Sequence, residues 1–324
     1  MINYTYQSVL APYIQGLLDE KHTLGYTYND EARFLRRFDQ YWLENNRDDS
    51  KITMDSLERW CRQRPTEGKR SQIHRIAVVR QLTLYMVGLG IPCYIPRVRI
   101  RYPKPIVHVL TRPEITEVFE RIDGYRPEKP YLATVRMANG YKFLFRLILT
   151  TGLRNSEAAS LRVSDVDWNM GTVVVYNSKG RKDRIIYCSE DMAEIGKNYL
   201  SYLRTALGYE PYWLFPGADP DTHVSSGTVT TRFRECWMQT SFAEACEKNP
   251  TVHALRHTFV VLRINSWMVQ GLDLNVLMPY LSKYLGHKSP DETFYYYHQV
   301  LEAFSVIRKK DTVANNVIPE ARVR

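Results

Sequence analysis

Four short stretches in the second half of the chain hold residue types that suit phosphate chemistry. They are TTGLRNSE with Arg154 and Glu157, SKGRKDR with Lys179, HALRH with His253 and Arg256, and LGH with His287. Arginine carries a lasting charge and a planar fork of donors that matches phosphate oxygens. Phosphoryl transfer depends mainly on positioned positive charge around those oxygens. Because no paired carboxylates accompany these cations, the set indicates a phosphodiester substrate.

Three consecutive tyrosines follow His287 and offer a candidate nucleophile. They are Tyr295, Tyr296 and Tyr297. On a helix, consecutive side chains project about 100° apart, so at most one of the three rings can face a given reactive centre. A tyrosine run by itself is more typical of core packing than of catalysis. The neighbouring stretches are what favour a nucleophile among them.

Two of the four stretches also have a plainer interpretation. Arg154 and Glu157 are three residues apart and could form an ordinary ion pair on a helix surface. Lys179 shares its turn with three further cations, which is also typical of a solvated loop. The occurrence of all four stretches in one chain favours a common site over four separate accidents.

The spacing of His253 and His257 raises the question of a metal. A zinc site of the HExxH type needs a glutamate directly after the first histidine, and Ala254 occupies that position. The chain also lacks the GxxxxGK[ST] loop that cradles nucleotide phosphates. The sequence therefore predicts neither a metal nor another cofactor.

The elements that must position these stretches are mostly helical. Apolar residues recur at three- and four-residue spacing through residues 1–95 and again through much of 190–305. Thr111 to Glu114 form a capping-box pattern, which predicts the start of a helix. The segment GTVVVYNSKGRKDRIIYCS predicts a β-hairpin with Lys179 at its tip. Asp165 and Asp167 suit the turn that leads into it.

Positive charge is concentrated in one part of the chain. The formal net charge is +9, and eleven Lys and Arg residues between Arg59 and Lys104 face a single Glu. A basic block indicates a polyanionic partner, although a solvated surface or a membrane-surface patch is an alternative. The candidate contact residues are Arg59, Arg62, Lys69, Arg70, Arg75, Arg80, Arg97, Arg99, Arg101 and Lys104.

Other features place the chain away from membranes and secretion. It has no window of eighteen apolar residues, and its first residues lack the pattern of a signal peptide. Its five cysteines are scattered and form no CxxC pair, which suits a reducing compartment. We therefore expect a cytoplasmic protein with no membrane partner.

Together the motifs resemble those of the tyrosine recombinase (phage integrase) family. The matching elements are TGLRNSE, the hairpin lysine, HALRH, LGH and a tyrosine nine residues after His287. The resemblance covers the second domain, residues 111–305, nearly end to end. It implies a mainly α fold with a small antiparallel β-sheet (α+β). It divides the chain into a helical DNA-binding domain (1–95), an extended basic linker (96–110), a catalytic domain (111–305) and a C-terminal tail (306–324).

The resemblance also implies how the phosphate is handled. Arg154 and Arg256 would grip the scissile phosphate. Lys179 would protonate the departing 5′ oxygen, a general-acid task that suits a lysine.

The remaining motif residues would serve the nucleophile. His253 and His287 would hydrogen-bond the phosphate or handle the proton of the nucleophile. Glu157 would orient the residues that contact the phosphate without contacting it itself, and His257 matches a histidine that frequently has a supporting role in the family. The nine-residue spacing selects Tyr296 as the attacking tyrosine and leaves its two neighbours to packing.

The implied activity is site-specific recombination of DNA through a 3′-phosphotyrosine intermediate. The family implies double-stranded DNA with a specific site, a homotetramer on two duplexes, a Holliday junction and a tail that docks on a neighbouring protomer. Accessory recombinases or directionality factors are candidate partners, and the protein would lie with the nucleoid of a prokaryotic cell. The form PYLSKYLGH favours a recombinase of mobile elements, although the spacer before LGH is about one helical turn longer than usual. Two alternatives stay open: a type IB-like topoisomerase, and a catalytically silent DNA-binding protein of the same fold.

Overall fold

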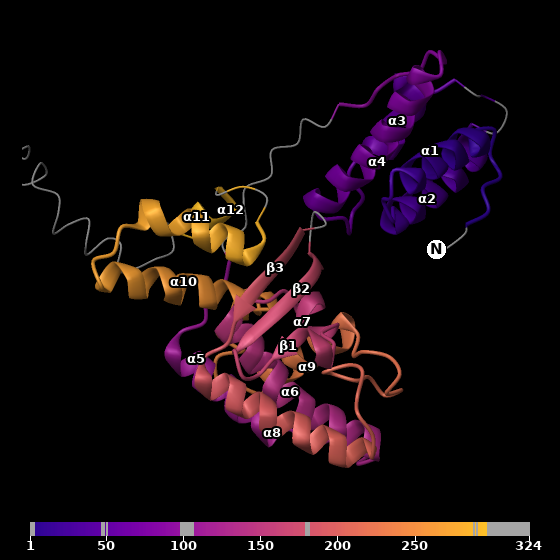
Figure 1. Cartoon of the computed structure of the whole chain (residues 1–324). Coiled ribbons are helices and arrows are strands. Elements are labelled where there is room, and N and C mark those ends of the chain that lie inside the picture. Colours follow the sequence, from indigo (N-terminus) through magenta and orange to yellow (C-terminus); the bar gives the residue numbers. More distant parts are fainter. Residues whose placement is uncertain are drawn as a thin grey trace, which may run out of the picture. The chain divides into compact units, whose positions relative to one another are not determined.

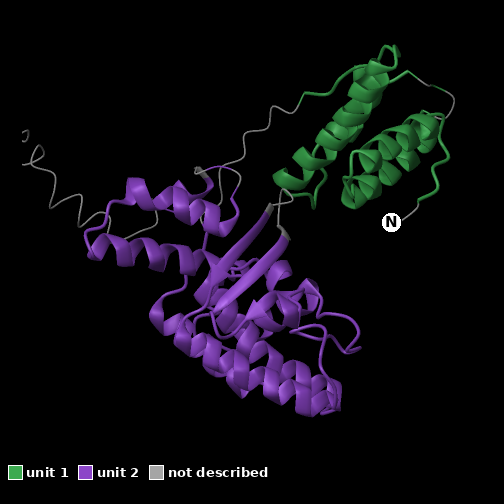
Figure 2. Cartoon of the chain, in the orientation of Figure 1, with its two compact units in different colours: residues 1–105 green, residues 106–324 purple. Residues whose placement is uncertain are grey.

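The structure is a computed structural model, which describes residues 4–46, 49, 51–97, 107–178, 182–287, 289 and 291–296. The chain divides into two compact units, Met1–Pro105 and Ile106–Arg324 (Figure 2). The basic linker and the C-terminal tail expected from the sequence lie largely outside the described residues. Within the described part, no helix is long and apolar enough to cross a bilayer.

Unit 1 is a small helical bundle (Figure 1). Its helices are α1 (Ala11–Thr23), α2 (Asn29–Asn45), α3 (Met54–Cys61) and α4 (Lys69–Gly88). The long α4 packs against the other three helices. Their apolar faces meet in a core that contains Leu35, Phe38, Trp42, Trp60 and Leu82. The edge of Trp60 packs on Phe38 with ring centroids 5.0 Å apart.

Unit 2 is larger and surrounds a second core with helices. They are α5 (Arg112–Gly124), α6 (Leu132–Thr151), α7 (Asn155–Ala159), α8 (Glu190–Leu207), α9 (Ser226–Trp237), α10 (His253–Val269), α11 (Leu274–Leu285) and α12 (Asp291–Phe294), with a 3₁₀ turn at Val163–Asp165. The capping box predicted at the start of α5 is confirmed, since Thr111 and Glu114 bond reciprocally. Helix α6 lies against both α8 and α10, so it is the central support of the unit.

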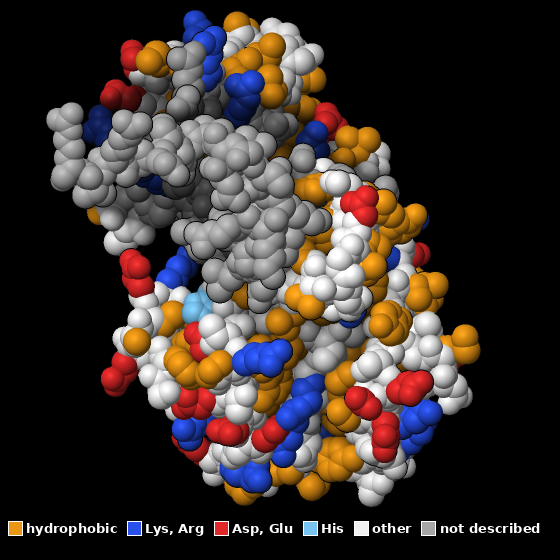
Figure 3. Space-filling view, turned by 90° about the vertical axis from the view of Figure 1, so that its left-hand side faces the viewer, with side chains coloured by type: hydrophobic (Ala, Val, Ile, Leu, Met, Phe, Trp, Pro, Cys, Tyr) orange, Lys and Arg blue, Asp and Glu red, His pale blue; other side chains and the backbone are white. Residues whose placement is uncertain are grey.

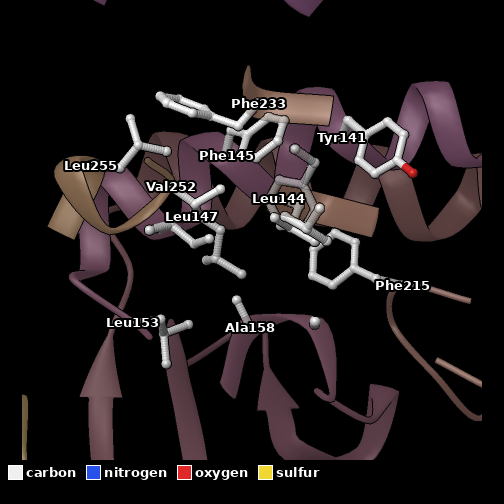
Figure 4. Close-up of a cluster of buried hydrophobic side chains, with 14 of the residues drawn as sticks. Tyr141, Leu144, Phe145, Leu147, Leu153, Ala158, Phe215, Phe233, Val252 and Leu255 are labelled. Atoms are coloured by element: carbon white, nitrogen blue, oxygen red, sulfur yellow. The ribbon is translucent and has the colours of Figure 1, made fainter. Parts of the chain in front are cut away.

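Apolar side chains from distant segments meet around α6. Figure 4 shows Leu144, Phe145 and Leu147 of α6 among Phe233 of α9 and Leu255 of α10. Each of these five side chains is almost completely buried. Burying a side chain of this size contributes roughly 1.5–3 kcal/mol relative to exposure. The core therefore fixes the start of α10, which carries HALRH, against the end of α6, which leads into TGLRNSE.

The predicted hairpin is present and gains a third, short strand. The strands are β1 (Val166–Asp167), β2 (Thr172–Ser178) and β3 (Lys182–Tyr187), joined in antiparallel order β1-β2-β3. Asp167 caps the turn into β2, because its carboxylate accepts hydrogen bonds from the backbone N–H groups of Asn169 and Met170. The predicted fold class, mainly helical with a small antiparallel sheet, is confirmed.

Candidate active site

The end of α6 is shaped to present Arg154. Gly152 has a φ of +68°, and a Cβ at that position would collide with the ring of Phe259. The chain thereby turns sharply and begins α7 with Arg154 as its N-cap. The Arg154 guanidinium donates to Glu157 Oε1 at 2.7 Å and to the Gly286 carbonyl at 2.7 Å. These bonds hold Arg154 between α7 and the LGH segment.

Glu157 balances two arginines. Its carboxylate accepts from Arg154 and also from Arg184 of β3, at 2.9 and 2.7 Å. Burial alone would raise the pKa of Glu157, but the bonds and charges of Arg184 and Arg154 outweigh burial and lower the pKa to about 2. The carboxylate is therefore ionised at neutral pH and keeps both guanidinium groups in place.

Arg184 is a site residue that the sequence analysis missed. It is nearly buried and, besides Glu157, its Nε donates to the Tyr284 carbonyl at 2.8 Å. The alternation of side chains along the hairpin could have identified Arg184. Arg184 pairs with Val175 and lies two residues from Ile186, and both of these are buried, so Arg184 points to the same inner face. It therefore ties the hairpin to α7 and to the end of α11.

Arg256 lies on α10 and is 1% exposed. Its guanidinium donates to the Gly152 carbonyl at 2.6 Å, to the Leu285 carbonyl at 2.8 Å and to His287 Nε2 at 3.1 Å. Burial and the neighbouring charge of Arg154 lower the pKa of Arg256 to about 10, so it remains cationic at neutral pH. Two backbone carbonyls and one ring nitrogen thus fix the plane of this cation.

The tautomer of His287 follows from its partners. Arginine can only donate, so His287 Nε2 must accept and the ring proton must lie on Nδ1. That Nδ1–H donates to Thr293 Oγ1 at 2.7 Å, and Thr293 is fully buried. Burial and the nearby arginines lower the pKa of His287 to about 3, which agrees with a neutral ring. Thr293 connects His287 to α12, directly ahead of the tyrosines.

Among the three tyrosines, Tyr296 is the one that lies in this cluster. Its side chain is 5% exposed, and its hydroxyl lies 2.6 Å from His257 Nδ1. Burial raises the pKa of Tyr296 to about 12, although Arg256 acts in the opposite direction. Tyr295 is only half-buried, and Tyr297 lies outside the described residues. The structure thus brings together Arg154, Glu157, Arg256, His287 and Tyr296.

The two remaining catalytic candidates are placed differently. His253 is the first residue of α10 and is exposed, with its ring edge-to-face on His257 at a centroid distance of 4.4 Å. The surrounding protein and the charges of Arg256 and Arg154 lower the pKa of His253. Lys179, predicted at the hairpin tip, lies outside the described residues. Within the described part of the chain, no group of three or more His, Cys, Asp or Glu side chains is arranged to hold a metal ion.

The basic stretch of unit 1 contains exposed and buried members. Arg59, Arg62, Lys69, Arg70 and Arg97 are exposed, and Arg80 is half-buried with a hydrogen bond to the Pro96 carbonyl at 3.0 Å. Arg99, Arg101 and Lys104 lie outside the described residues. On the face seen in Figure 3, Lys and Arg side chains are interspersed with Asp and Glu.

Arg75 corrects the sequence prediction. It was expected to contact a polyanion, but it is 1% exposed and its guanidinium donates to both carboxylate oxygens of Glu67, at 2.8 and 2.6 Å. It also donates to the carbonyl groups of Trp60 and Arg62 and lies over the Trp60 ring. Glu67 thus neutralises the charge of Arg75, and its other donors bind backbone carbonyls of the same bundle, so Arg75 supports the fold of unit 1 rather than a contact with a polyanion.

We expect Arg75→Ala to destabilise unit 1 by about 3 kcal/mol or more, because the largely buried Glu67 loses its partner. Arg70→Ala is the matched control, since it removes an exposed charge from the same helix and should leave stability within about 0.5 kcal/mol of wild type. Urea unfolding followed by tryptophan fluorescence measures both. Equal stability of the two variants would contradict the structural role of Arg75.

Comparisons with known proteins identify the family and the fold of the chain. The sequence model of the phage integrase family matches residues 131–302. A protein described as an integrase/recombinase, y4rE of Sinorhizobium fredii, is 26% identical over 299 residues, which cover 89% of this chain and 91% of the relative. A tyrosine recombinase of Pseudothermotoga lettingae is 26% identical over 296 residues, with 89% of this chain and 91% of the relative covered.

A solved structure shares the fold. The Tn1549 transposon integrase, in complex with transposon right end DNA, superposes with a TM-score of 0.62 at 14% identity, covering 93% of this chain and 99% of that one. The family match extends over more than half of the chain and includes Arg154, Arg256, His287 and Tyr296. The chain therefore belongs to the phage integrase family and is a tyrosine recombinase, an enzyme that breaks and rejoins DNA strands at specific sites.

Proposed function

We propose that Tyr296 is the nucleophile of this recombinase and that the enzyme serves the integration or excision of a mobile element. One observation carries the assignment of Tyr296. Its hydroxyl lies 2.6 Å from Nδ1 of His257, the residue next to Arg256 on α10, and the charge of Arg256 favours a negative charge on that oxygen. In this proposal a phosphodiester bound by Arg256 is the group that the Tyr296 hydroxyl attacks.

Arg154 and Arg256 bind the non-bridging oxygens of the scissile phosphate in this proposal. Both guanidinium groups are fixed in advance by backbone carbonyls, those of Gly286 for Arg154 and of Gly152 and Leu285 for Arg256. Preorganised charge of this kind stabilises the developing charge of the transition state without reorganisation. Glu157 keeps Arg154 in position, and Arg184 holds Glu157.

The covalent step conserves the energy of the phosphodiester bond. Tyr296 Oη bonds to phosphorus and the 5′ oxygen departs, so the DNA is left with a 3′-phosphotyrosine and a free 5′ hydroxyl. Lys179 is proposed to protonate the departing oxygen. The 5′ hydroxyl of the partner strand then attacks the phosphotyrosine, so rejoining needs no nucleotide cofactor.

The assembly is proposed to be a homotetramer on two duplexes, with a Holliday junction between the two rounds of exchange. Residues 1–95 would act as a DNA-binding domain through exposed cations such as Arg59, Arg62 and Arg70. Residues 96–110 would be the linker, residues 111–305 the catalytic domain, and residues 306–324 the tail that docks on a neighbouring protomer. Accessory recombinases or directionality factors would set the direction, and the setting would be the nucleoid of a prokaryotic cytoplasm.

The proposed role in mobile elements rests on the sequence form PYLSKYLGH and agrees with the shared fold of a transposon integrase. Cleavage mapping on the DNA that flanks the gene tests it. Cleavage at a site that borders a movable segment would support the proposal. Cleavage confined to a chromosomal site for dimer resolution, or relaxation of supercoils by a monomer without strand exchange, would contradict it.

Chelation of divalent metals is expected to leave cleavage unchanged. The positive charge at the phosphate comes from Arg154 and Arg256 in the proposed mechanism, with Lys179 as the proton donor. A nicked suicide duplex traps the covalent adduct, which a denaturing gel then separates and counts. Adduct yield in 10 mM EDTA should stay within about twofold of that without chelator, since no catalytic step involves a metal. Abolition by EDTA, with recovery on added Mg²⁺, would contradict the mechanism.

A further inference from the structure

The Tyr296 hydroxyl has a specific partner, and it is not one of the two histidines expected to handle its proton. His257 Nδ1 lies 2.6 Å from Tyr296 Oη. His287 uses Nε2 to accept from Arg256 and Nδ1 to donate to Thr293, so both of its nitrogens are engaged elsewhere. His253 meets the site through its edge-to-face ring contact with His257. We propose that His257 is a catalytic residue that accepts the proton of Tyr296 as its oxygen attacks the phosphate.

This inference rests on the proposed role of Tyr296 as the nucleophile. It moves His257 from a supporting position to direct contact with a reacting atom. The adjacency of two residues in the sequence explains how α10 can both bind the phosphate and accept the proton of the nucleophile. Arg256 and His257 are consecutive on α10, so their side chains project about 100° apart. Arg256 faces the proposed phosphate site, and His257 contacts the hydroxyl of Tyr296.

In the free protein both members of the pair are in the protonation state from which the transfer would start. Burial, with the neighbouring His253 and Arg256, lowers the pKa of His257 to about 3, so the ring is neutral before DNA binds. The phenol is protonated at neutral pH, and burial raises the pKa of Tyr296 further, to about 12. The hydroxyl then donates to an unprotonated Nδ1, and the proton of the neutral ring lies on Nε2.

The transfer is balanced as follows. The O–H bond of Tyr296 breaks and its proton passes to His257 Nδ1, while the oxygen lone pair forms the bond to phosphorus. The bond from phosphorus to the 5′ oxygen breaks, and that oxygen takes a proton from the general acid. The imidazolium formed on His257 lies near the cation Arg256. In the complex with DNA, the negative charge of the scissile phosphate offsets the repulsion between these two cations. In the reverse step His257 returns its proton to the tyrosine oxygen.

The support of α10 keeps this geometry in place. Thr258, next to His257, is fully buried and its hydroxyl accepts from the Leu110 backbone N–H at 2.9 Å. On the other side, Leu255 is buried in the core around α6. Leu255 and Thr258 therefore anchor α10 on both sides of Arg256 and His257. A substitution of His257 by a side chain of similar size should leave the backbone of the helix in place.

His257→Asn is the informative variant. An asparagine amide can place an oxygen close to the position of Nδ1 and accept a hydrogen bond from Tyr296, but it does not take up a proton. General-base catalysis contributes typically 10²–10⁴-fold, so we expect single-turnover cleavage of a suicide duplex to slow by about 10²-fold or more. His257→Gln is the second variant, and circular dichroism with a DNA-binding assay checks that each variant is folded.

The decisive comparison changes the acidity of the nucleophile. Tyr296 is replaced by 3,5-difluorotyrosine, whose phenol is more acidic, both in the wild-type background and in His257→Asn. If His257 is the base, fluorination should recover at least about 10-fold of the lost rate in His257→Asn and change the wild type by less than about threefold. A residue that only positions Tyr296 would show the same fluorination effect in both backgrounds, and that result would overturn the proposal.

A parallel measurement separates failure of this inference from failure of the proposed function. Wild-type rates in His257→Asn would overturn the role of His257 while leaving Tyr296 as the nucleophile. A covalent adduct formed by Tyr296→Phe would instead show that Tyr296 is not the nucleophile, and the inference about His257 would then lose its premise.

Discussion

Tyr296→Phe is expected to form no covalent adduct with DNA while it binds the same duplex as tightly as the wild type. The substitution removes one oxygen atom and keeps the ring, which is 5% exposed and packs beside His257. The lost atom is the one that would bond to phosphorus, so no residual route to the phosphotyrosine remains. The adduct on a suicide duplex is measured on a denaturing gel, and binding is measured by gel shift at fixed salt.

Tyr295→Phe is the matched control, because it removes the same atom from the neighbouring ring. Tyr295 is half-buried, with its ring centroid 5.8 Å from that of Tyr296. Cleavage should persist in this variant, and likewise in Tyr297→Phe. Loss of the adduct in Tyr295→Phe, together with normal cleavage by Tyr296→Phe, would show that the nine-residue spacing selects the wrong ring.

Arg256→Lys should lose cleavage by about 10²–10³-fold even though it keeps a positive charge. Arg256 donates at the same time to the Gly152 carbonyl, the Leu285 carbonyl and His287. A lysine ammonium is a point charge without the planar fork of donors, so it cannot bind these three partners and at the same time donate to phosphate oxygens. His287 would then lose the donor that fixes its tautomer. Single-turnover cleavage rates measure the effect, and a thermal melt checks the fold.

Arg204→Lys provides a control for the arginine exchange. Arg204 lies on α8 and forms an exposed pair with Glu210. Exposed pairs contribute little, so neither stability nor cleavage should change measurably. Cleavage by Arg256→Lys at the rate of Arg204→Lys would contradict the assignment of Arg256 to the phosphate.

The parts of the site that lie on motifs could be predicted from the sequence. Arg154 and Glu157 are three residues apart at a helix start, which brings them together through local geometry alone. The hairpin followed from two β-rich runs around a turn, and α5 followed from its capping box. In these cases the contact partners are close in the sequence, so spacing is enough to place them.

The parts that depend on tertiary packing were missed or misassigned. Arg75 looked like its exposed neighbours because a local charge count does not reveal Glu67 closing on it inside the bundle. Arg184 looked like part of a cationic turn, although alternation with the buried Ile186 places it on the inner face. The partner of Tyr296 could not be read from the sequence, because 39 positions separate it from His257 and three histidines were available.

Identification of the modified residue in the trapped adduct tests the central claim most directly. The wild-type enzyme is reacted with a suicide duplex, the adduct is digested with nuclease and protease, and the peptide that carries the nucleotide is sequenced by mass spectrometry. The proposed mechanism predicts a 3′-phosphodeoxynucleotide on Tyr296. A nucleotide on Tyr295, on Tyr297 or on any other side chain would contradict it.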